Sequence, residues 1–581
     1  MDSRGFLRRF KSSKADIELG REILKKFIIQ SENKVDRNST EASLENDSLK
    51  LIYKNWNLHS SSPLPIKSPI DLTPYQFLST YNNDKSYIAI PRLSVTKLLT
   101  DSWCELREYY SIYGVSRFKT SKAITQGLRV HENLETTTHK VIDTTDLSKK
   151  LEVNVKQKVD EIERQIQLTS DPEEIERQQQ RLAQFNLNAY GNIPESKLAI
   201  EWAQSILSRL FTLFSTSEAR EVLIHGYIDL NKGEFCHEIK SNCINNQNNV
   251  LVSGIVDQIR IVDKLNPQNL DLFETVNQNL EYEFPNCINN IRIIDFSRYF
   301  DVIGNITKDF HDYKILVTDV KTRGFNSIPG QKSVIESAKY QTFYYRKFLG
   351  LLSNENTHEN FAYYSLLENA RIRGIDVDKP INYSTIVQML RKFPDILYQD
   401  FIKLSNGDKI GFKPFDDYHH NLIDHYYNLN DYFDSGFHCN NLKLINDLNE
   451  VDDFDYKNLF TEDILKQWQI PPTLRYFAAR GNQFYQLCSQ ILGDTTTVDY
   501  HNHRTNSCFQ TNTYDYDEHE LNDQLYKAST FWNGKRAPTP TTDLDKCKYC
   551  DFSPKCVVPT PPTLPDEKKL GSLVYEFLDS T

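Results

Sequence analysis

Two aspartates lie inside stretches rich in Val and Ile, Asp257 in GIVDQIRI and Asp319 in LVTDVKTR, and Lys321 comes two residues after Asp319. If both stretches are strands, their side chains alternate between two faces, so Asp319 and Lys321 point to one side and Val320 to the other. Pairing of the two strands would bring Asp257 alongside Asp319. The sequence therefore predicts two carboxylates and a lysine close together on a sheet.

Two converging carboxylates repel each other unless a divalent cation lies between them. Oxygen ligands favour Mg²⁺ or Mn²⁺ over zinc. Such an ion can lower the pKa of a water and stabilise charge that builds on a phosphate, while Lys321 could orient that water or neutralise the transition state. The alternative is an ordinary ion pair at a strand edge, because Asp-x-Lys is a short and common pattern.

Two expected helices carry further polar residues with a spacing of four. Gly127, His131 and Glu135 would share one helix face, and the glycine would let that face approach a sheet closely. His131 could then supply a nitrogen ligand to the same ion, although a lone helical histidine can equally be structural. Gln341 and Tyr345 could position a phosphate or the attacking water, or they could form an ordinary polar face.

Three cysteines near the C-terminus, Cys547, Cys550 and Cys556, have the spacing C-x2-C-x5-C. In a chain with no secretory signal, closely spaced cysteines indicate a metal rather than a disulfide framework. Cys104, which follows a tryptophan just before the His131 helix, is the candidate for a fourth ligand. Four thiolates suit a [4Fe–4S] cluster, but they also suit zinc, so the ligand count does not choose the metal.

The chain has 581 residues and a formal net charge of −11, which does not by itself indicate a nucleic-acid binder. No apolar run approaches the ~18 residues of a membrane span, so no membrane partner is expected. The range 314–347 differs, with a local net charge of +5 that would suit an anion. Its basic residues are Lys314, Lys321, Arg323, Lys332, Lys339, Arg346 and Lys347, against Asp319 and Glu336.

The N-terminal part is polar and precedes the expected core. Residues 1–25 open with MDSRGFLRRFKSSK, which has five basic residues and one acid and resembles an organellar targeting segment. A disordered basic tail is the alternative. Residues 26–90 are rich in Ser, Asn and Pro and are expected to form a flexible arm.

The rest of the sequence reads as mixed α/β. Residues 220–228 and 233–239 flank an Asn-Lys-Gly turn and predict a hairpin. Apolar residues rich in Val and Ile predict further strands at 250–263 and 313–323. Amphipathic periodicity predicts helices at 120–135, 195–214 and 332–352. We expect a solvated insertion at 144–186, an Asn-rich insertion at 264–312, and a mixed helical pattern at 355–530.

These motifs, in this order, resemble those of the exonuclease V family, which belongs to the RecB-like PD-(D/E)XK nucleases with an iron–sulfur cluster. The resemblance spans residues 93–556. It is carried by LSVTKLLTDSWCEL (93–106), GLRVHENLE (127–135), SGIVDQI (253–259), TDVKTR (318–323), QTFYY (341–345), FWNGKRAP (531–538) and the terminal cysteines.

The resemblance implies a restriction-endonuclease-like core over 91–565, with a cluster-binding segment at 540–560 and a tail at 566–581. It implies that Mg²⁺ is bound by His131, Asp257, Asp319 and the Val320 carbonyl, that Lys321 is the catalytic lysine, and that Gln341 and Tyr345 support it. Cys104, Cys547, Cys550 and Cys556 would hold a [4Fe–4S] cluster that clamps the two ends of the core. One departure is Asp319, where many members have Glu.

The activity implied is that of a Mg²⁺-dependent exonuclease specific for single-stranded DNA, acting 5′→3′ and releasing short oligonucleotides. For a fungal member it implies a mitochondrial location, with nuclear and cytoplasmic locations as alternatives. We expect a monomer that grips DNA with basic residues such as Arg323 and Lys347, with a single-strand-binding protein as a candidate partner.

Two other classes of protein fit parts of the sequence. One is an inactive iron–sulfur or zinc DNA-binding protein with a degenerate nuclease core, against which the intact Asp257, Asp319 and Lys321 argue. The other is a redox protein that uses the cluster, but we find no pattern for a flavin or nicotinamide site.

Overall fold

The computed structural model describes residues 72–81, 92–113, 122–139, 194–239, 249–266, 271–381 without 310, 396–425 and 468–553. It also describes most of 160–179, together with Thr385, Ile386, Met389 and Cys556. The predicted targeting segment and the C-terminal tail lie outside these residues.

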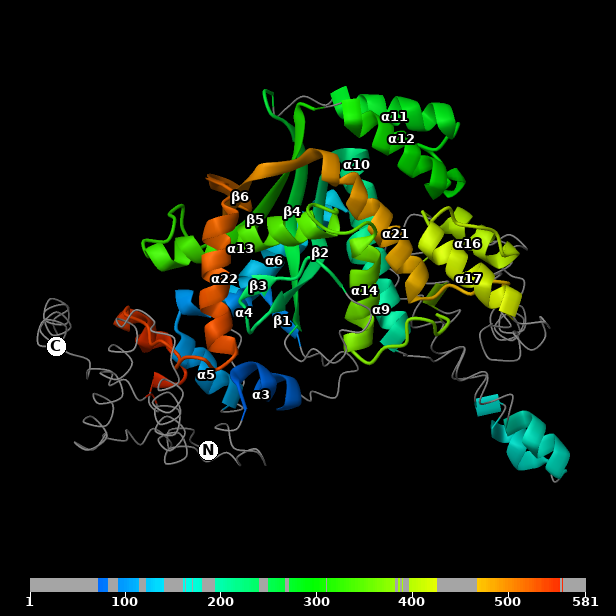
Figure 1. The fold of residues 1–581 in the computed structure, drawn as a ribbon, viewed down its shortest axis with the longest axis horizontal. Helices are drawn as coiled ribbons and strands as arrows, with labels where there is room; N and C mark the ends of the chain where they lie inside the picture. The colour runs from blue at the N-terminus through cyan, green and yellow to red at the C-terminus, as the bar shows by residue number, and fades with distance from the viewer. Residues whose placement is uncertain are drawn as a thin grey trace, which may run out of the picture.

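A mixed sheet stands at the centre of the described residues, flanked by helices (Figure 1). Its seven strands are β1 (Arg92–Ser94), β2 (Glu218–Asp229), β3 (Glu234–Phe235), β4 (Asn249–Asp263), β5 (Tyr313–Arg323), β6 (Leu492–Asn502) and β7 (Ser507–Asp515). The order is β3-β2-β4-β5-β6-β7, and β1 pairs with β4. The β1–β4 and β5–β6 pairs are parallel and the others antiparallel.

Helix α13 (Lys332–Leu352) crosses the sheet and packs on β2, β4, β5 and β6 (Figure 1). Helix α6 (Lys122–Thr138) packs on β2 and β5. The other helices of the body are α4 (Val95–Leu98), α5 (Glu105–Tyr113), α9 (Pro194–Trp202), α10 (Arg209–Thr216), α11 (Asp271–Glu283), α12 (Phe296–Asp309), α14 (Phe361–Ile372), α16 (Tyr398–Asn406), α17 (Lys413–His425), α21 (Leu474–Leu487) and α22 (Glu518–Trp532).

The predicted hairpin, both further strands and all three helices are present. The helix predicted at 195–214 is divided, because a π-helical segment, η3 (Ala203–Ser208), joins α9 to α10. The mixed helical pattern predicted at 355–530 was incomplete, since it contains β6 and β7. These strands were missed because LGDTTTVDYHN and SCFQTNTYD are rich in Thr, Asn and Asp rather than in Val and Ile.

Part of the arm predicted at 26–90 is an ordered helix, which corrects that prediction for residues 72–81. Helix α3 (Pro74–Tyr81) buries Phe77 against Tyr113 of α5, with ring centroids 4.5 Å apart. The Tyr113 hydroxyl donates a hydrogen bond to the Leu72 carbonyl at 2.9 Å. The aromatic residues of PYQFLSTY give this helix an apolar face that the polar composition of its surroundings concealed.

The two predicted insertions differ in how they contact the body. In 264–312, α11 and α12 bury Leu272, Phe273, Phe296 and Tyr299 in the main core. In 144–186, the described residues are helical and mostly exposed, as expected of a solvated insertion. Among the helices of the described chain, none combines the length and hydropathy that crossing a membrane requires.

Close approach between β2 and α13 depends on a residue without a side chain. A Cβ atom at Gly226 would lie 2.3 Å from the ring of Phe348, which is fully buried. Two carbon atoms that are not bonded cannot approach that closely, so any larger residue would displace α13 or the strand. The position of α13 matters because this helix carries Gln341 and Tyr345.

We predict that Gly226→Ala lowers the free energy of unfolding by about 1–3 kcal/mol, because a well-packed core resists an added methyl group. Gly330→Ala is the matched control, since a Cβ at Gly330 has no atom within 4 Å. Urea denaturation of both variants measures the difference. Equal stability of the two variants would contradict the packing described here.

Candidate active site and cysteine-lined pocket

The predicted carboxylate pair is present where β4 and β5 run side by side. The antiparallel register pairs Gln258 with Thr318, and this places Asp257 beside Asp319 at the next position along the ladder. The Val320 amide donates a hydrogen bond to Asp257 Oδ2 at 2.6 Å. Val320 thus contacts the site through its amide, and its carbonyl as a metal ligand stays a prediction.

Lys321 connects the acidic pair to α13, as the shared strand face predicted. Its Nζ donates hydrogen bonds to Asp319 Oδ1 and to Gln341 Oε1, both at 3.0 Å. The Gln341 amide in turn donates to the Tyr345 hydroxyl at 2.6 Å. Gln341 and Tyr345, expected as a supporting pair from their spacing of four, therefore form one chain of hydrogen bonds with Lys321.

Asp319 is fully buried, and its two carboxylate oxygens differ in their hydrogen bonding. Oδ1 accepts the Lys321 hydrogen bond, whereas Oδ2 lies 2.8 Å from the same ammonium and accepts no hydrogen bond among the described residues. A buried carboxylate needs compensating charge, and Lys321 supplies it. Oδ2 keeps lone pairs that could bind a metal ion.

His131 reaches the site from α6, as predicted. Its Nδ1 lies 3.8 Å from Asp257 Oδ1 and 3.4 Å from Glu221 Oε1. Donor atoms of these three residues all lie within 4.8 Å of one another. Asp319 is not a member of this tight group, so the structure joins His131 to Asp257 and Glu221 and joins Asp319 to Lys321.

Glu221 was missed by the sequence analysis, which placed it inside a hairpin strand. It lies opposite Asp257 where the pairing of β2 with β4 is interrupted, and its φ is 54°. A side chain at a left-handed backbone position costs about 1–2 kcal/mol. An acidic residue beside the apolar run VLIHGYI was the only signal, and sequence does not reveal the backbone conformation that turns it toward His131.

Electrostatics follow from the burial of several charges. Burial raises the pKa of Asp257 to about 7, and Asp319 adds to that shift. Burial alone would lower the pKa of Lys321, but Asp319 and Asp257 outweigh it and raise this pKa. The hydrogen bond with Glu221 raises the pKa of His131 against the opposing effect of burial. The group therefore holds excess negative charge that a cation would neutralise.

The predicted basic patch is partly wrong, because three of its members form ion pairs with carboxylates from outside the 314–347 window. Lys347 is buried and pairs with Glu518 at 2.5 Å, so it cannot grip DNA as expected. Lys339 pairs with Glu520 at 2.6 Å and Arg346 pairs with Glu355. These side chains fasten α13 to its neighbours, and the net charge of a sequence window does not show such pairing.

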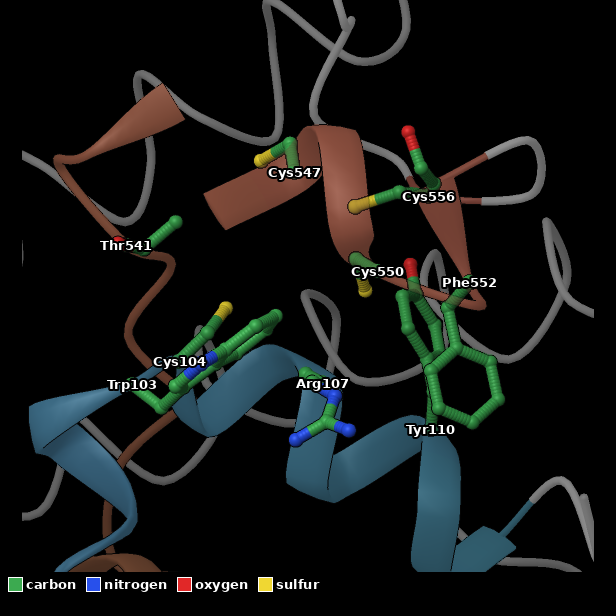
Figure 2. Close-up of a pocket in the computed structure, with 10 residues that line it drawn as sticks. Trp103, Cys104, Arg107, Tyr110, Thr541, Cys547, Cys550, Phe552 and Cys556 are labelled. Carbon is green, nitrogen blue, oxygen red and sulfur yellow. The ribbon is translucent and has the colours of Figure 1, made fainter. Parts of the chain in front are cut away.

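The four predicted cysteine ligands line one pocket. Cys104 lies just before α5, and Cys547, Cys550 and Cys556 lie in or after the 3₁₀ segment η9 (Leu544–Tyr549). Figure 2 shows the Cys104 and Cys550 thiols pointing toward each other across the gap between these two parts of the chain. Burial raises the pKa of Cys104, and burial followed by Cys104 raises that of Cys547 to about 11.

Protein contacts also hold the cysteine segment against α5. Glu105 is 1% exposed, and both guanidinium nitrogens of Arg536 donate to its carboxylate at 2.5 Å. The Thr539 amide donates to Glu105 at 2.8 Å, and Lys546 donates to the Ser102 carbonyl at 2.9 Å. The pocket is thus shaped by an ion pair and backbone contacts as well as by the thiols.

The sequence matches the family described as "Exonuclease V - a 5' deoxyribonuclease" over residues 88–170 and 174–557. The chain belongs to the exonuclease V family. Exonuclease V proteins are hydrolases that degrade DNA from an end, so the chain belongs to a family of exodeoxyribonucleases.

Relatives from three yeasts are similar over most of their length. "Exonuclease V, mitochondrial" of Scheffersomyces stipitis is 43% identical, with 96% of this chain and 99% of the relative covered. The protein of the same name from Debaryomyces hansenii is 39% identical, with 93% and 86% covered. That from Candida albicans is 37% identical, with 96% and 85% covered.

Proposed function

We propose that this exonuclease V is a Mg²⁺-dependent enzyme that digests single-stranded DNA from a 5′ end in mitochondria. Family membership supports the 5′ deoxyribonuclease activity, and the names of the three yeast relatives support the location. We further propose that residues 91–565 form a PD-(D/E)XK core, since two aspartates and a lysine stand on adjacent strands of a mixed sheet.

The hydrogen-bonded contact between Lys321 and the buried Asp319 is the observation that carries this proposal. A buried ion pair between a lysine and an aspartate is a costly way to stabilise a fold, because desolvation offsets the attraction. Its position beside a second carboxylate, that of Asp257 on the adjacent strand, fits catalysis better than structural support.

Asp257, Asp319 and His131 would hold the Mg²⁺, and Glu221 adds a fourth candidate ligand. The set offers mainly carboxylate oxygens, which suit Mg²⁺ or Mn²⁺. A divalent cation in such a site helps to form a nucleophile from water at neutral pH and neutralises charge on a phosphate. The Val320 amide orients the Asp257 carboxylate through its 2.6 Å hydrogen bond.

Lys321 would act on the scissile phosphate or on the attacking water. Its ammonium donates hydrogen bonds to Asp319 and Gln341, which fix its position. Gln341 is itself oriented by the buried Tyr345. This chain fixes the lysine before substrate arrives, which is what electrostatic stabilisation of a transition state requires.

We predict that Lys321→Ala lowers the rate of DNA cleavage by about 10²–10³-fold, the usual cost of removing one preorganised group that stabilises charge. Cleavage of end-labelled single-stranded DNA, with Mg²⁺ or EDTA, measures this rate. Lys314→Ala is the matched control, because Lys314 lies on the same strand and donates to Thr495 at 3.0 Å.

Wild type and Lys314→Ala should trim the strand only with Mg²⁺, and duplex DNA should be cut far more slowly. If wild type binds the strand but fails to cut it whichever divalent metal is added, the acidic site is a relic and the chain is a binding protein braced by a cluster. If Lys321→Ala cuts as fast as wild type, the role given to this lysine is wrong.

An exposed aromatic ring near Lys321 supports the preference for single strands. Phe325, 71% exposed, lies two residues after β5 ends, and the Arg504 guanidinium stands over its ring at 5.4 Å. The loop is fastened to the β6–β7 turn, since the His503 amide donates to the Arg323 carbonyl at 3.0 Å. An exposed ring beside the Arg504 guanidinium suits an unpaired base and its phosphate.

We predict that Phe325→Ala weakens binding of single-stranded DNA about 5- to 150-fold, which corresponds to the ~1–3 kcal/mol of one stacked base. Fluorescence anisotropy in a Lys321→Ala background, which prevents digestion, measures the affinity. Phe325→Trp should keep the affinity of wild type. Tyr282→Ala on α11 is the control, because Tyr282 is also exposed (87%), and its affinity should be unchanged. Unchanged affinity in Phe325→Ala would exclude this stacking site.

We propose that the four cysteines hold a [4Fe–4S] cluster rather than a single zinc ion. The four thiols are not grouped closely: among the described residues, only two other sets of side chains bring their donor atoms within 4.8 Å of one another. Thiolates around one zinc ion would be about 3.8 Å apart, given a zinc–sulfur bond near 2.3 Å. The spacing of these thiols therefore favours a [4Fe–4S] cluster, which four cysteine thiolates also ligate.

We predict that Cys550→Ser, purified without oxygen, loses its iron and its affinity for DNA and lowers the melting temperature. Iron analysis, anisotropy and calorimetry measure the three quantities. Cys236→Ser, directly after β3, is the matched control and should keep its iron. An iron-free Cys550→Ser protein that stays folded through the Glu105–Arg536 contacts and cuts DNA normally would remove the clamp role.

A further inference from the structure

A second set of metal-ligating side chains lies at the other end of the sheet order, on β6 and β7. Donor atoms of Asp499, His501 and Cys508 all lie within 4.8 Å of one another. The pairing of β6 with β7 shifts by one residue between Tyr500 and His501, which places Cys508 opposite His501. Such bulges re-aim a side chain, and this one brings the thiol to the imidazole.

His501 is the feature that points to a ligand. It is 7% exposed, and its buried Nδ1 has no hydrogen-bond partner among the described residues. Buried polar groups are almost always paired, so an exception calls for an explanation.

Asp499 keeps coordination capacity despite two neighbours. The Thr511 hydroxyl donates to its Oδ1 at 2.6 Å. The Arg260 guanidinium lies 4.0 Å from its Oδ2, which is longer than a hydrogen bond. A carboxylate offers about four lone-pair sites, and the hydroxyl uses one of them. Asp499 can therefore be a ligand that Thr511 orients.

We propose that Asp499, His501 and Cys508 form a zinc site separate from the Mg²⁺ site and from the cysteine-lined pocket. A thiolate, an imidazole and a carboxylate are the donor types that zinc accepts in tetrahedral sites, whereas Mg²⁺ does not favour sulfur. Three protein ligands leave one coordination position for water or an anion. The proposal does not depend on the nuclease activity.

The position of the site indicates what the zinc does. β7 is the last strand in the described sheet order, and most of its side chains are exposed. A metal bound by Asp499 and His501 of β6 and Cys508 of β7 would fasten this strand to its neighbour. Zinc that binds only the folded chain stabilises it in proportion to its occupancy, so the melting temperature should respond to zinc.

The test uses the full chain with its iron retained, treated with chelator, reloaded with Zn²⁺ and desalted. Zinc and iron are counted by elemental mass spectrometry, and melting temperatures are measured with and without Zn²⁺. Wild type should hold one more zinc per chain than Cys508→Ser and His501→Ala, with equal iron in all three. Zn²⁺ should raise the melting temperature of wild type alone among them.

Cys236→Ser is the matched control, because Cys236 follows β3 at the opposite end of the strand order. It should bind zinc as wild type does. If Cys508→Ser retains the full zinc content, or if wild type binds no zinc when its iron is complete, the proposal is overturned. Cys508 is exposed, so this variant stays informative even if His501→Ala fails to fold.

Discussion

The buried carboxylate of Asp319 is the constraint on which the centre of this molecule depends. An ionised group with no exposure to water needs compensating charge, and Lys321 supplies it from two residues along the same strand. Lys321 is in turn held by Gln341 and Tyr345 of α13, and Gly226 lets α13 lie close to the sheet. Asp257 adds a second negative charge on the adjacent strand, and His131 and Glu221 complete the group from α6 and β2. Five elements thus converge on an excess of negative charge that a divalent cation would balance.

The two ends of the described core meet at a second junction, which the cysteines line. Cys104 and α5 lie beside the segment that carries Cys547, Cys550 and Cys556 (Figure 1, Figure 2). The buried Glu105 binds Arg536 and the Thr539 amide, so this junction is specified by charge as well as by thiols. A metal cluster at this junction would close a long loop of chain and so lower the conformational entropy of the unfolded state. It would thereby stabilise the whole core. The β6–β7 pair carries a third set of donors. The three sets differ in chemistry: the acidic site offers mainly carboxylate oxygens, the cysteine-lined pocket offers thiols, and the β6–β7 set offers one carboxylate, one imidazole and one thiol.

Sequence reasoning found the parts of the site that depend on simple periodicities. Alternation along a strand predicted that Asp319 and Lys321 lie together, and a spacing of four predicted the Gln341–Tyr345 pair. It missed what depends on long-range geometry. Glu221 requires a left-handed backbone position, Phe325 requires a loop fastened to a turn of distant sequence, and β6 and β7 have polar sequences that become strands beside β5. The prediction that Lys347 binds DNA failed because its ion-pair partner, Glu518, is distant in sequence and approaches it only in the folded chain.

The proposed function requires that the acidic group bind a divalent ion. Electron paramagnetic resonance can follow the binding of Mn²⁺ to wild type, Asp257→Asn and Lys314→Ala without requiring cleavage. We expect one Mn²⁺ site in wild type and Lys314→Ala, displaced by Mg²⁺, and loss of that site in Asp257→Asn. Equal Mn²⁺ affinity in wild type and Asp257→Asn would show that Asp257 does not bind the ion.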